Sequence, residues 1–468
     1  MSTLKKNILY NIGYQVLSLI VPLITAPYIF RVLGKDGIGV YGYTFSIAHY
    51  FVLFCMLGVL NYGNREISMA SNNPYEKSEK FWQIYLNQFV FGILSLGFYW
   101  VFVDTCVKEN QLIYLIQALY IISGIVDISW FYFGIEKFKM TTSISAVNKI
   151  LTTILIFVFI KSSNDVWIYT IIIAGGTLLN NVFYWLFLHK FLIRISFSCS
   201  AALSHLKPLL LLFIPVIAVN IYKYIDKIML GTMCGVGDVG IFDAAEKLTN
   251  IPMSFIAAIG TVMLPRISSM LSTNETKGVQ RYNNKSLNLV MFLSAGMTFG
   301  LVGISDVFIP LFYGEGFMDS IEVLVWLSPC MLFVSWANVI RTQYLLPKRK
   351  DKLFCLSVVA GAVVNVVSNI VFIPLWGAIG AAISTLFAEI AVCLSQSAAA
   401  NKDMNLKHSL IMILPYLLIG TIMYFIISSI YLDSAVICTI VRILVGMAVY
   451  GLLSLYFINK SLNISSLF

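Results

Sequence analysis

Apolar segments about as long as a membrane-spanning helix follow one another along almost the entire chain. A helix that crosses the hydrocarbon core needs roughly 20 predominantly apolar residues. Fourteen such windows lie between charged or turn-forming residues, namely 8–30, 38–60, 82–103, 112–134, 142–160, 166–188, 209–231, 239–264, 287–305, 322–346, 353–375, 377–399, 409–429 and 435–457. We therefore predict an all-α polytopic membrane protein with about fourteen transmembrane helices.

Composition excludes several other classes of protein. Of the 468 residues, 59% are apolar and only 11% are charged, whereas charged residues make up about 25% of ordinary soluble domains. A soluble enzyme, a nucleic-acid-binding protein, a disordered chain and a secreted disulfide-rich domain are all incompatible with these values.

The distribution of Lys and Arg among the connections predicts the topology. Cytoplasmic loops of membrane proteins are enriched in these residues. With the N-terminus inside, the inside segments carry 21 Lys and Arg and the outside segments carry four, which are Arg31, Lys35, Lys108 and Lys161. We expect both termini in the cytoplasm and an uncleaved first span. The net charge of +9 then reflects cytoplasmic loops, and we expect no nucleic-acid partner.

Sequence signals for catalysis and cofactors are missing. The eight cysteines have no metal-binding or redox spacing, and no Walker A loop occurs, so we expect no metal, no cofactor and no enzymatic activity. The longest connection on the outer side, about 306–321, leaves no room for the outer domain that a membrane-embedded glycan polymerase usually needs. A transporter fits this sequence better than a polymerase or an ion channel.

A segment of the first half recurs in the second half. Gly37-Ile-Gly39-Val-Tyr41 resembles Asp238-Val-Gly240-Ile-Phe242, and the two central glycines are 201 residues apart. Parallel repeats are a known transporter architecture with the substrate site at the repeat interface, although turns that follow apolar helices also resemble one another by chance. We predict two pseudo-symmetric six-helix lobes, 1–190 and 207–400, a cytoplasmic linker at 191–206, and two additional helices in 401–468.

Charged side chains inside the predicted spans are the main candidates for function. Each costs roughly 2.5–3.5 kcal/mol near the centre of the membrane, so such residues usually face protein or water. The basic members are Lys149, Lys223, Lys227, Lys247, Arg341 and Arg442. Arg341 and Arg442 lie near the ends of their spans, where a long side chain can instead extend to the interface.

Two charge clusters occupy neighbouring spans. Lys223, Asp226 and Lys227 stand at i, i+3 and i+4, so they share one helix face. Asp243, Glu246, Lys247 and Asn250 form a similar stripe on the next span. Two interpretations remain open, namely a static ion-pair network that joins the two helices, or groups that contact a substrate or an ion.

Other polar residues and prolines within spans give further candidates. The repeat offset pairs His49 with Asn250 and favours an inward-facing His49, although such a histidine often only bonds to a neighbouring helix. Asp127 and Glu389 are candidates for coupling ions, because carboxylates at membrane depth commonly relay protons or cations. Asn365 and Asn369, at i and i+4, favour interhelical hydrogen bonds.

Proline removes a helical hydrogen bond and kinks the axis. Pro22, Pro27 and Pro215 interrupt their spans, so we predict kinks there that serve gating, with static kinks as the alternative.

Short motifs rich in Gly, Pro and charged residues occur in both halves of the chain. The N-terminal motifs are Pro22-Leu-Ile-Thr-Ala-Pro-Tyr28, Arg31-Val-Leu-Gly34, Gly37-Ile-Gly-Val-Tyr41, and Tyr62-Gly63 with Arg65-Glu66. The C-terminal motifs are Asp226-Lys-Ile-Met-Leu-Gly231, Gly240-Ile-Phe-Asp-Ala-Ala-Glu-Lys247, and Asn365 with Pro374, Gly377-Ala-Ile-Gly380 and Glu389. Together they resemble the motifs of the polysaccharide-transport family within the multidrug/oligosaccharidyl-lipid/polysaccharide superfamily.

The resemblance implies two six-helix lobes around a central cavity and a flippase for oligosaccharide repeat units of O-antigen or capsule on a polyprenyl diphosphate carrier. It places the protein in the bacterial cytoplasmic membrane, with membrane lipids around it, as a monomer that works beside the polymerase and glycosyltransferases of one pathway. The candidate substrate-cavity residues are Arg31, His49, Lys149, Lys223, Lys227, Glu246, Lys247 and Arg341. The candidate ion-coupling residues are Asp127, Asp226, Asp243 and Glu389. A cation or drug antiporter of the same superfamily is the alternative, and a glycan polymerase is a weaker one.

Overall fold

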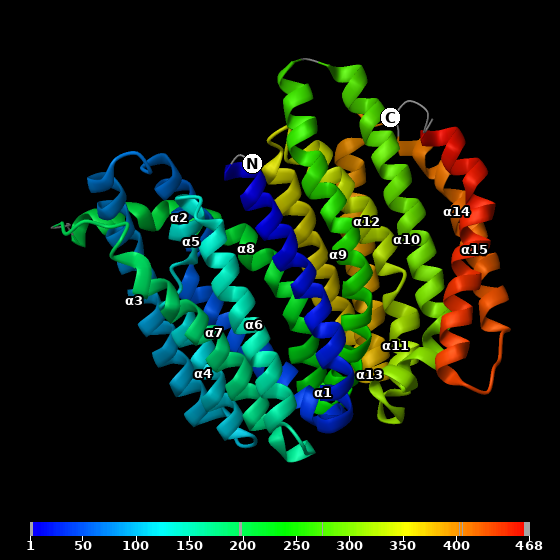
Figure 1. Cartoon of the computed structure of the whole chain (residues 1–468), viewed down its shortest axis with the longest axis horizontal. Coiled ribbons are helices and arrows are strands. Elements are labelled where there is room, and N and C mark those ends of the chain that lie inside the picture. Colours follow the sequence, from blue (N-terminus) through cyan, green and yellow to red (C-terminus); the bar gives the residue numbers. More distant parts are fainter. Residues whose placement is uncertain (1–2, 196–198, 274, 402, 405, 463–468) are drawn as a thin grey trace. The chain divides into compact units, whose positions relative to one another are not determined.

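Helices account for the regular structure in all parts of the chain that the structure describes. A computed structural model describes residues 3–195, 199–273, 275–401, 403–404 and 406–462. The α-helices are α1 (Thr3–Met56), α2 (Val59–Met69), α3 (Pro74–Cys106), α4 (Gln111–Ile125), α5 (Ser129–Gly134), α6 (Phe138–Phe159), α7 (Val166–Leu188), α8 (Cys199–Met233), α9 (Val236–Ser272), α10 (Thr276–Tyr313), α11 (Ser320–Leu327), α12 (Cys330–Ile340), α13 (Asp351–Ala400), α14 (Leu406–Ser428) and α15 (Ala435–Leu462). Figure 1 draws these residues as helices, which confirms the all-α prediction.

Eleven helical segments of the described residues are long and apolar enough to cross a membrane, and the two halves of α8 raise this number to twelve if they form one span. Two segments exceed one membrane thickness. Helix α1 has 54 residues and α13 has 50, which at 1.5 Å per residue gives about 75–80 Å against roughly 30 Å of hydrocarbon. Each contains one glycine with a non-helical backbone, Gly34 and Gly377. Two crossings in each would give fourteen spans, and that number stays a prediction.

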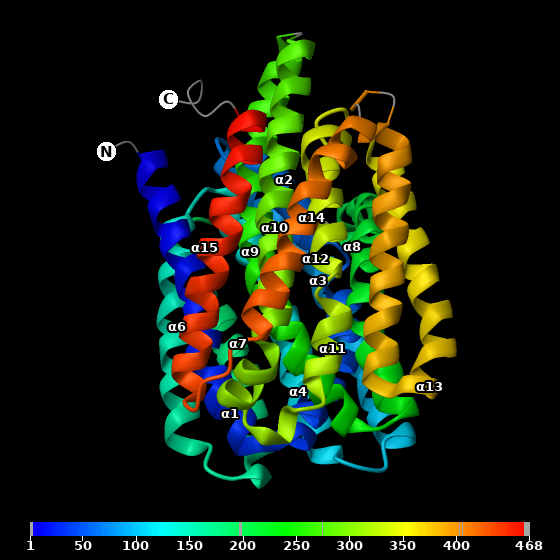
Figure 2. The ribbon, with the colours of Figure 1, turned by 90° about the vertical axis from the view of Figure 1, so that its right-hand side faces the viewer.

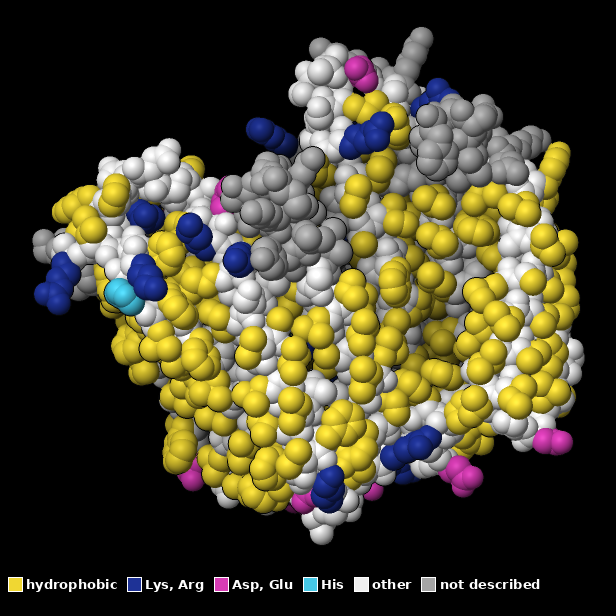
Figure 3. Space-filling model, in the orientation of Figure 1, with side chains coloured by type: hydrophobic (Ala, Val, Ile, Leu, Met, Phe, Trp, Pro, Cys, Tyr) yellow, Lys and Arg dark blue, Asp and Glu magenta, His cyan; other side chains and the backbone are white. Residues whose placement is uncertain are grey.

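Apolar side chains also cover the outside of the helices, as a lipid environment requires. On the face drawn in Figure 3 they fill the middle of the molecule, and charged groups lie near the helix ends. Phe98 is 68% exposed and Leu375 is 64% exposed. Soluble proteins rarely expose large continuous apolar patches, so this surface supports membrane insertion.

The chain divides into two compact units, Met1–Asn220 and Ile221–Phe468. The boundary lies inside α8, beyond the predicted linker 191–206. The last residues of that linker, 199–206, belong to α8. His205 there is buried, and its ring bridges the hydroxyl of Tyr62 at 2.6 Å and the amide oxygen of Gln83 at 2.9 Å. This part of the predicted linker is therefore packed into the first unit by hydrogen bonds.

Two glycines give structural support for the internal repeat. Gly34 has φ 67° and ψ 176°, and Gly235 has φ 114° and ψ 170°. Positive φ with extended ψ is a region that only glycine readily enters. The two residues are 201 positions apart, the same offset that relates the two sequence motifs. The shared backbone conformation indicates equivalent turns in the two units.

The prolines coincide only in part with breaks in the helices. Pro22 and Pro27 lie inside α1, where the residue with non-helical dihedral angles is Gly34. In α8, the segments Ser200–Ile214 and Val219–Met233 meet at 52°, and Pro215 follows directly after the first segment. Kinks with a gating role at these prolines stay a prediction.

Gln88 and Trp130 organise the interior of the first unit. The Gln88 amide donates to the carbonyls of Gly124 and Asp127 at 2.7 and 2.8 Å, and its oxygen accepts from the Trp130 indole at 3.1 Å. These bonds satisfy carbonyl groups at the break between α4 and α5, where helical partners are missing. A Cβ on Gly63 would approach the Trp130 ring to 2.4 Å, so α2 needs a glycine at this contact.

The C-terminal hairpin of α14 and α15 packs against α10 in the second unit, as Figure 2 shows from the side. Arg442 of α15 is fully buried there, and extension of its side chain to the membrane interface stays a prediction. Its guanidinium donates to Asp306 at 2.6 Å and to the carbonyls of Gly303 and Ile430 at 3.1 and 3.0 Å. Since α10 extends to Tyr313, Asp306 is helical, and the predicted outer connection 306–321 was too long.

We expect loss of the Asp306 carboxylate to destabilise the protein more than loss of both partners. Asp306→Ala leaves the Arg442 cation buried without its counter-ion, and breaking a buried pair in this way costs about 3–5 kcal/mol. The half-exposed Asp306 side chain places the expected value at or below the lower end of this range. In the double variant Asp306→Ala/Arg442→Met, removal of the buried cation should restore part of the lost stability. Thermal unfolding of purified protein in detergent compares both variants with the wild type.

The matched control is Asp433→Ala, because Asp433 is an exposed acid in the α14–α15 connection. Its melting temperature should equal that of the wild type. Equal melting temperatures for Asp306→Ala and Asp433→Ala would contradict the proposed stabilising role of the Arg442 pair.

Candidate functional site

The charge clusters predicted on neighbouring spans meet between α8 and α9. Lys227 of α8 lies 2.5 Å from Asp243 and 2.7 Å from Glu246 of α9. The other oxygen of Asp243 lies 2.9 Å from Lys247, one turn further along α9. Lys227 and Asp243 are buried. We call Lys227, Asp243, Glu246 and Lys247 the α8–α9 ion-pair network.

Two cations and two carboxylates balance within this network. The attraction within the pairs offsets part of the cost of desolvating these charges at membrane depth, and removing one partner would leave the other charge uncompensated. The α8–α9 geometry therefore favours the structural interpretation for Lys227 and Asp243. Glu246 and Lys247 are less buried, with side-chain exposures of 22% and 39%.

Lys223 differs from Lys227 although both belong to one helix. It is exposed, and the cationic contact that the structure records for it is with the ring of its neighbour Tyr224, at 5.9 Å. The predicted shared face therefore separates into two buried residues, Asp226 and Lys227, and one exposed residue. Lys223 is the member of the α8 cluster whose charge points out of the buried network.

Asp226 is held by the opposite neighbour, α13. One carboxylate oxygen accepts hydrogen bonds from Asn365 and Asn369 at 2.9 and 2.6 Å, and the other accepts from the hydroxyl of Thr385 at 2.7 Å. The predicted interhelical role of the two asparagines is present in the structure. Because Gly377 breaks α13 between Asn369 and Thr385, this single carboxylate joins α8 to both halves of α13.

The sequence interpretation missed Thr385, which carries no charge and lies 159 residues from Asp226. A signal was present, because Thr385 lies one turn before Glu389 on the same helix. Metal ions that prefer oxygen ligands bind carboxylate, amide and hydroxyl oxygens. The amide nitrogens of Asn365 and Asn369 face Asp226, so this arrangement is occupied by hydrogen bonds. No cluster of three or more His, Cys, Asp or Glu side chains suited to a metal occurs within the described parts of the chain.

The two remaining ion-coupling candidates, Asp127 and Glu389, have different surroundings. The Asp127 carboxylate accepts the backbone N–H of Ser129 at 2.8 Å, which satisfies one of the open donors at the start of α5. Glu389 of α13 is partly buried and lies one turn after Thr385, whose hydroxyl bonds to Asp226. Glu389 is therefore the carboxylate of this pair that stands near other candidate residues.

His49 and Lys149 of the first unit also contact neighbouring helices. The His49 ring lies 3.4 Å from the side-chain oxygen of Asn220 in α8, which agrees with the interhelical alternative. Lys149 of α6 is half-buried, with its ammonium 5.8 Å from the centre of the Tyr14 ring. A cation over an aromatic ring is stabilised by the ring quadrupole. A substrate contact for either residue stays a prediction.

Arg31 and Arg341 lie at helix irregularities. Arg31 is exposed, one turn before the non-helical Gly34 of α1. Arg341 begins the π-helical segment Arg341–Leu345 and donates to the side-chain oxygen of Asn338 at 2.6 Å. π-Helical turns often mark functional sites. The predicted cavity residues therefore occupy both units, and the strongest direct contacts among them occur within the α8–α9 ion-pair network.

The two interpretations of the α8–α9 ion-pair network predict different behaviour for Asp243→Asn. In a structural network this substitution removes the carboxylate charge that both Lys227 and Lys247 contact, so the free energy of unfolding should fall by about 3 kcal/mol or more. In a substrate-binding role, transport falls while stability stays unchanged. Thermal unfolding in detergent, measured beside a transport assay, separates the two, and we expect the loss of stability.

Lys223→Met is the matched control for this experiment, because it removes an exposed cation from the same helix. Its melting temperature should stay at the wild-type value. A melting temperature for Asp243→Asn that equals that of Lys223→Met would reject the structural role.

Comparison with known proteins agrees with this architecture. One curated relative is the Escherichia coli (strain K12) protein named "Putative O-antigen transporter", which is 24% identical over 394 residues, or 83% of this chain and 95% of that protein. The solved structure of the lipid II flippase MurJ, in an inward closed conformation, matches with a TM-score of 0.77 at 20% identity, covering 97% of this chain and 99% of that one.

A second solved structure, an inward-facing multidrug resistance transporter of the MATE family, matches with a TM-score of 0.57 at 13% identity, over 83% of this chain and 99% of that one. At these identities the two structures show that the fold is shared. The family model described as "Polysaccharide biosynthesis protein" matches residues 4–271, which is more than half of the chain. The resemblance predicted from the motifs is confirmed, and this protein belongs to the polysaccharide biosynthesis protein family.

Proposed function

We propose that this protein moves lipid-linked oligosaccharide repeat units from the cytoplasmic to the outer leaflet by alternating access, for assembly of a surface polysaccharide such as O-antigen, capsule or exopolysaccharide. The observation that carries the proposal is the alignment with an O-antigen transporter, because it covers 95% of that relative. The apolar helices and the charged groups inside them support a transporter of a large polar substrate.

The chemistry of the carrier fits the cationic candidates. A diphosphate is anionic, and ammonium or guanidinium groups bind phosphate oxygens through charge-assisted hydrogen bonds. Lys227 and Lys247 already bond to Asp243 and Glu246. The exposed Lys223 is therefore the α8 residue that we assign to the diphosphate or to acidic sugars.

The alternatives receive less support from the geometry. A cation or drug antiporter needs a pocket with excess negative charge, and the acids of the α8–α9 ion-pair network are matched by lysines. A glycan polymerase needs an outer domain, and the connection from α10 to α11 spans only 314–319.

The proposed activity implies a cellular location, a topology and neighbouring steps in a pathway. We place it as a monomer in the bacterial cytoplasmic membrane with both termini in the cytoplasm, as the distribution of Lys and Arg predicts. Its substrate comes from membrane-associated glycosyltransferases, and its product passes to a polymerase on the outer side.

Proteoliposomes that contain a labelled polyprenyl-diphosphate oligosaccharide in the inner leaflet test the flipping activity. We expect the sugar to become accessible to an added lectin only when the protein is present. Lys223→Ala should lower the rate about tenfold or more, because a hydrogen bond to a charged group contributes about 1.5–3 kcal/mol. Protein-free liposomes give the background rate.

Sugar exposure that is equal with and without protein would reject the flippase proposal. Efflux of cationic dyes by the same proteoliposomes would favour the antiporter. A melting temperature measured for Lys223→Ala shows whether any loss of flipping reflects loss of fold.

We further propose that cation entry drives the cycle through Asp226 and Glu389. One charge that crosses 100 mV yields about 2.3 kcal/mol, which is enough to bias substrate release. Asp226 joins α8 to both halves of α13, so its charge state changes the contacts between three helical segments. Asp127 and Asp243 are weaker candidates for ion coupling. The Asp127 carboxylate accepts the first backbone N–H of α5, and Asp243 is paired with lysines.

Collapse of the proton and sodium gradients should slow flipping by the wild type. The variants Asp226→Asn and Glu389→Gln keep the side-chain shape but remove the charge, and we expect their slower rates to be insensitive to both gradients. Asp433→Asn, in the exposed connection before α15, should respond like the wild type. A wild-type rate that stays constant without gradients would reject coupling while leaving flipping intact.

A further inference from the structure

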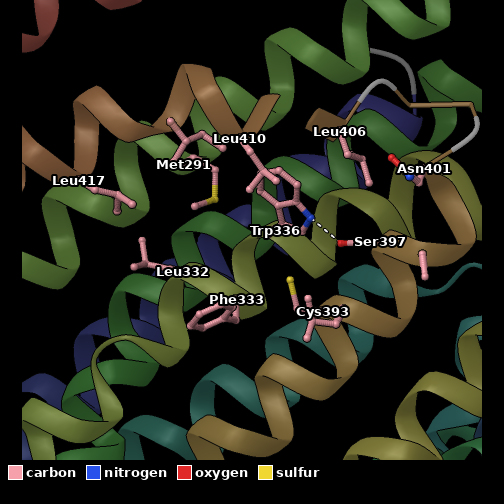
Figure 4. A pocket seen from close by; sticks show the side chains of 13 residues that line it. Met291, Leu332, Phe333, Trp336, Cys393, Ser397, Asn401, Leu406, Leu410 and Leu417 are labelled. Carbon is pink, nitrogen blue, oxygen red and sulfur yellow. Dashed lines mark hydrogen bonds between the residues drawn. The ribbon is translucent and has the colours of Figure 1, made fainter. Parts of the chain in front are cut away.

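An apolar pocket lies on the flank of the second unit, between α10, α12, α13 and α14 (Figure 4). Its volume is about 440 Å³, within the range of roughly 300–1,000 Å³ for sites that bind small molecules. Met291, Leu332, Trp336, Cys393 and Leu410 line it. Leu394 and Leu410 at its rim are 63% and 56% exposed, so the pocket opens toward the space that lipid chains occupy around a membrane protein.

The pocket extends over the depth of one leaflet. Leu406 and Leu417 line its two ends on α14, and they are 11 residues apart, which corresponds to about 16 Å along the helix. Half of the hydrocarbon core is about 15 Å. The Leu406 end lies where α13 finishes at Ala400 and α14 begins, so the pocket runs from the membrane interface toward the centre.

Water is a poor occupant of this pocket. A buried water needs two to four polar partners. Polar side chains reach the lining at Ser397, whose hydroxyl already accepts the Trp336 indole N–H at 2.9 Å, and at Asn401 near the interface. An empty pocket would lose dispersion contacts along its whole lining. A flexible hydrocarbon chain satisfies both constraints.

One basic turn lies near the Leu406 end of the pocket. The turn after the π-helical segment carries Lys348, Arg349 and Lys350. Tyr344 connects this turn to the α13–α14 connection, since its hydroxyl contacts Lys350 at 2.5 Å and Asp403 at 2.8 Å. Lys348 pairs with Asp403 at 2.6 Å. The formal charges of Asp351 and Lys352, which follow Lys350 in the sequence, cancel. The cationic excess therefore lies beside the mouth of the pocket.

We infer that this pocket binds one anionic glycerophospholipid, with an acyl chain along α14 and the phosphate at the Lys348–Lys350 turn. Basic pockets between transmembrane helices on the cytoplasmic side are known to bind anionic headgroups, and the distribution of Lys and Arg predicts this end to be cytoplasmic. The acyl chain fills the pocket between α13 and α14. The lipid is therefore a bound component of the second unit that stays in place and is not transported.

Native mass spectrometry of delipidated, detergent-solubilised protein tests the inference. Phosphatidylglycerol, phosphatidylethanolamine with the same acyl chains, and polyprenyl phosphate are added in separate titrations. We expect one phosphatidylglycerol per chain, bound at least tenfold more tightly than phosphatidylethanolamine. Leu410→Trp, which narrows the opening, should weaken binding at least tenfold, and Arg349→Glu should remove the headgroup preference.

Matched controls keep the result interpretable. Leu418→Trp introduces the same ring at a 65% exposed position of α14 outside the pocket lining, and Arg194→Glu reverses an exposed charge in the first unit. Both should bind like the wild type. Absence of a saturable 1:1 complex, equal affinity for both phospholipids, tighter binding of polyprenyl phosphate, or wild-type binding by Leu410→Trp would each overturn the inference. These measurements do not involve transport, so their failure leaves the flippase proposal untouched.

Discussion

The cost of placing charge among apolar helices determines how the second unit is held together. Two adjacent residues of α8, Asp226 and Lys227, find compensating partners on different neighbouring helices. Lys227 turns toward α9 and pairs with Asp243 and Glu246, whereas Asp226 turns toward α13 and accepts three side-chain hydrogen bonds. Since an uncompensated charge at this depth costs several kcal/mol, α8 is fixed between two partners by two adjacent residues. The packing of α8, α9 and α13 depends on these contacts.

The same constraint explains the position of the C-terminal hairpin. Arg442 lies in an otherwise apolar helix and reaches the Asp306 carboxylate and two backbone carbonyls. A guanidinium presents several donors in a fixed fork, so it can join α15, the end of α14 and α10 at one point. Apolar contacts alone have little orientational preference between lipid-facing helices. The buried arginine therefore specifies how the hairpin attaches.

Sequence periodicity predicted what is local and missed what is distant. The apolar windows, the asparagine pair at i and i+4, and the glycine motif repeated after 201 residues depend on spacing along the chain. They agree with the apolar helices, the interhelical bonds of the asparagines and the two positive-φ glycines. The face predicted to join Lys223 to Lys227 does not hold, because Lys223 is exposed and Lys227 is buried. The side-chain partners of Asp226 and Arg442 lie more than 130 residues away in the chain, and no spacing rule identifies them. Kinks were predicted at Pro22 and Pro27, whereas the non-helical residue of α1 is Gly34, which lies in the predicted connection 31–37 and has dihedral angles that glycine tolerates.

A substrate with a diphosphate requires cations whose charge is not neutralised inside the protein. A single sequence only counts lysines and acids within spans, and it assigns them all equal weight. Once α8 and α9 are placed, two of the lysines are matched by two acids, and Lys223 remains at an exposed position. Among the ion-coupling candidates in the second unit, Asp226 and Glu389 lie outside the network. The structure thus distinguishes residues that hold helices together from residues whose charge can act on a ligand or a coupling ion. This distinction depends on which charges are paired and which are buried, and composition contains neither.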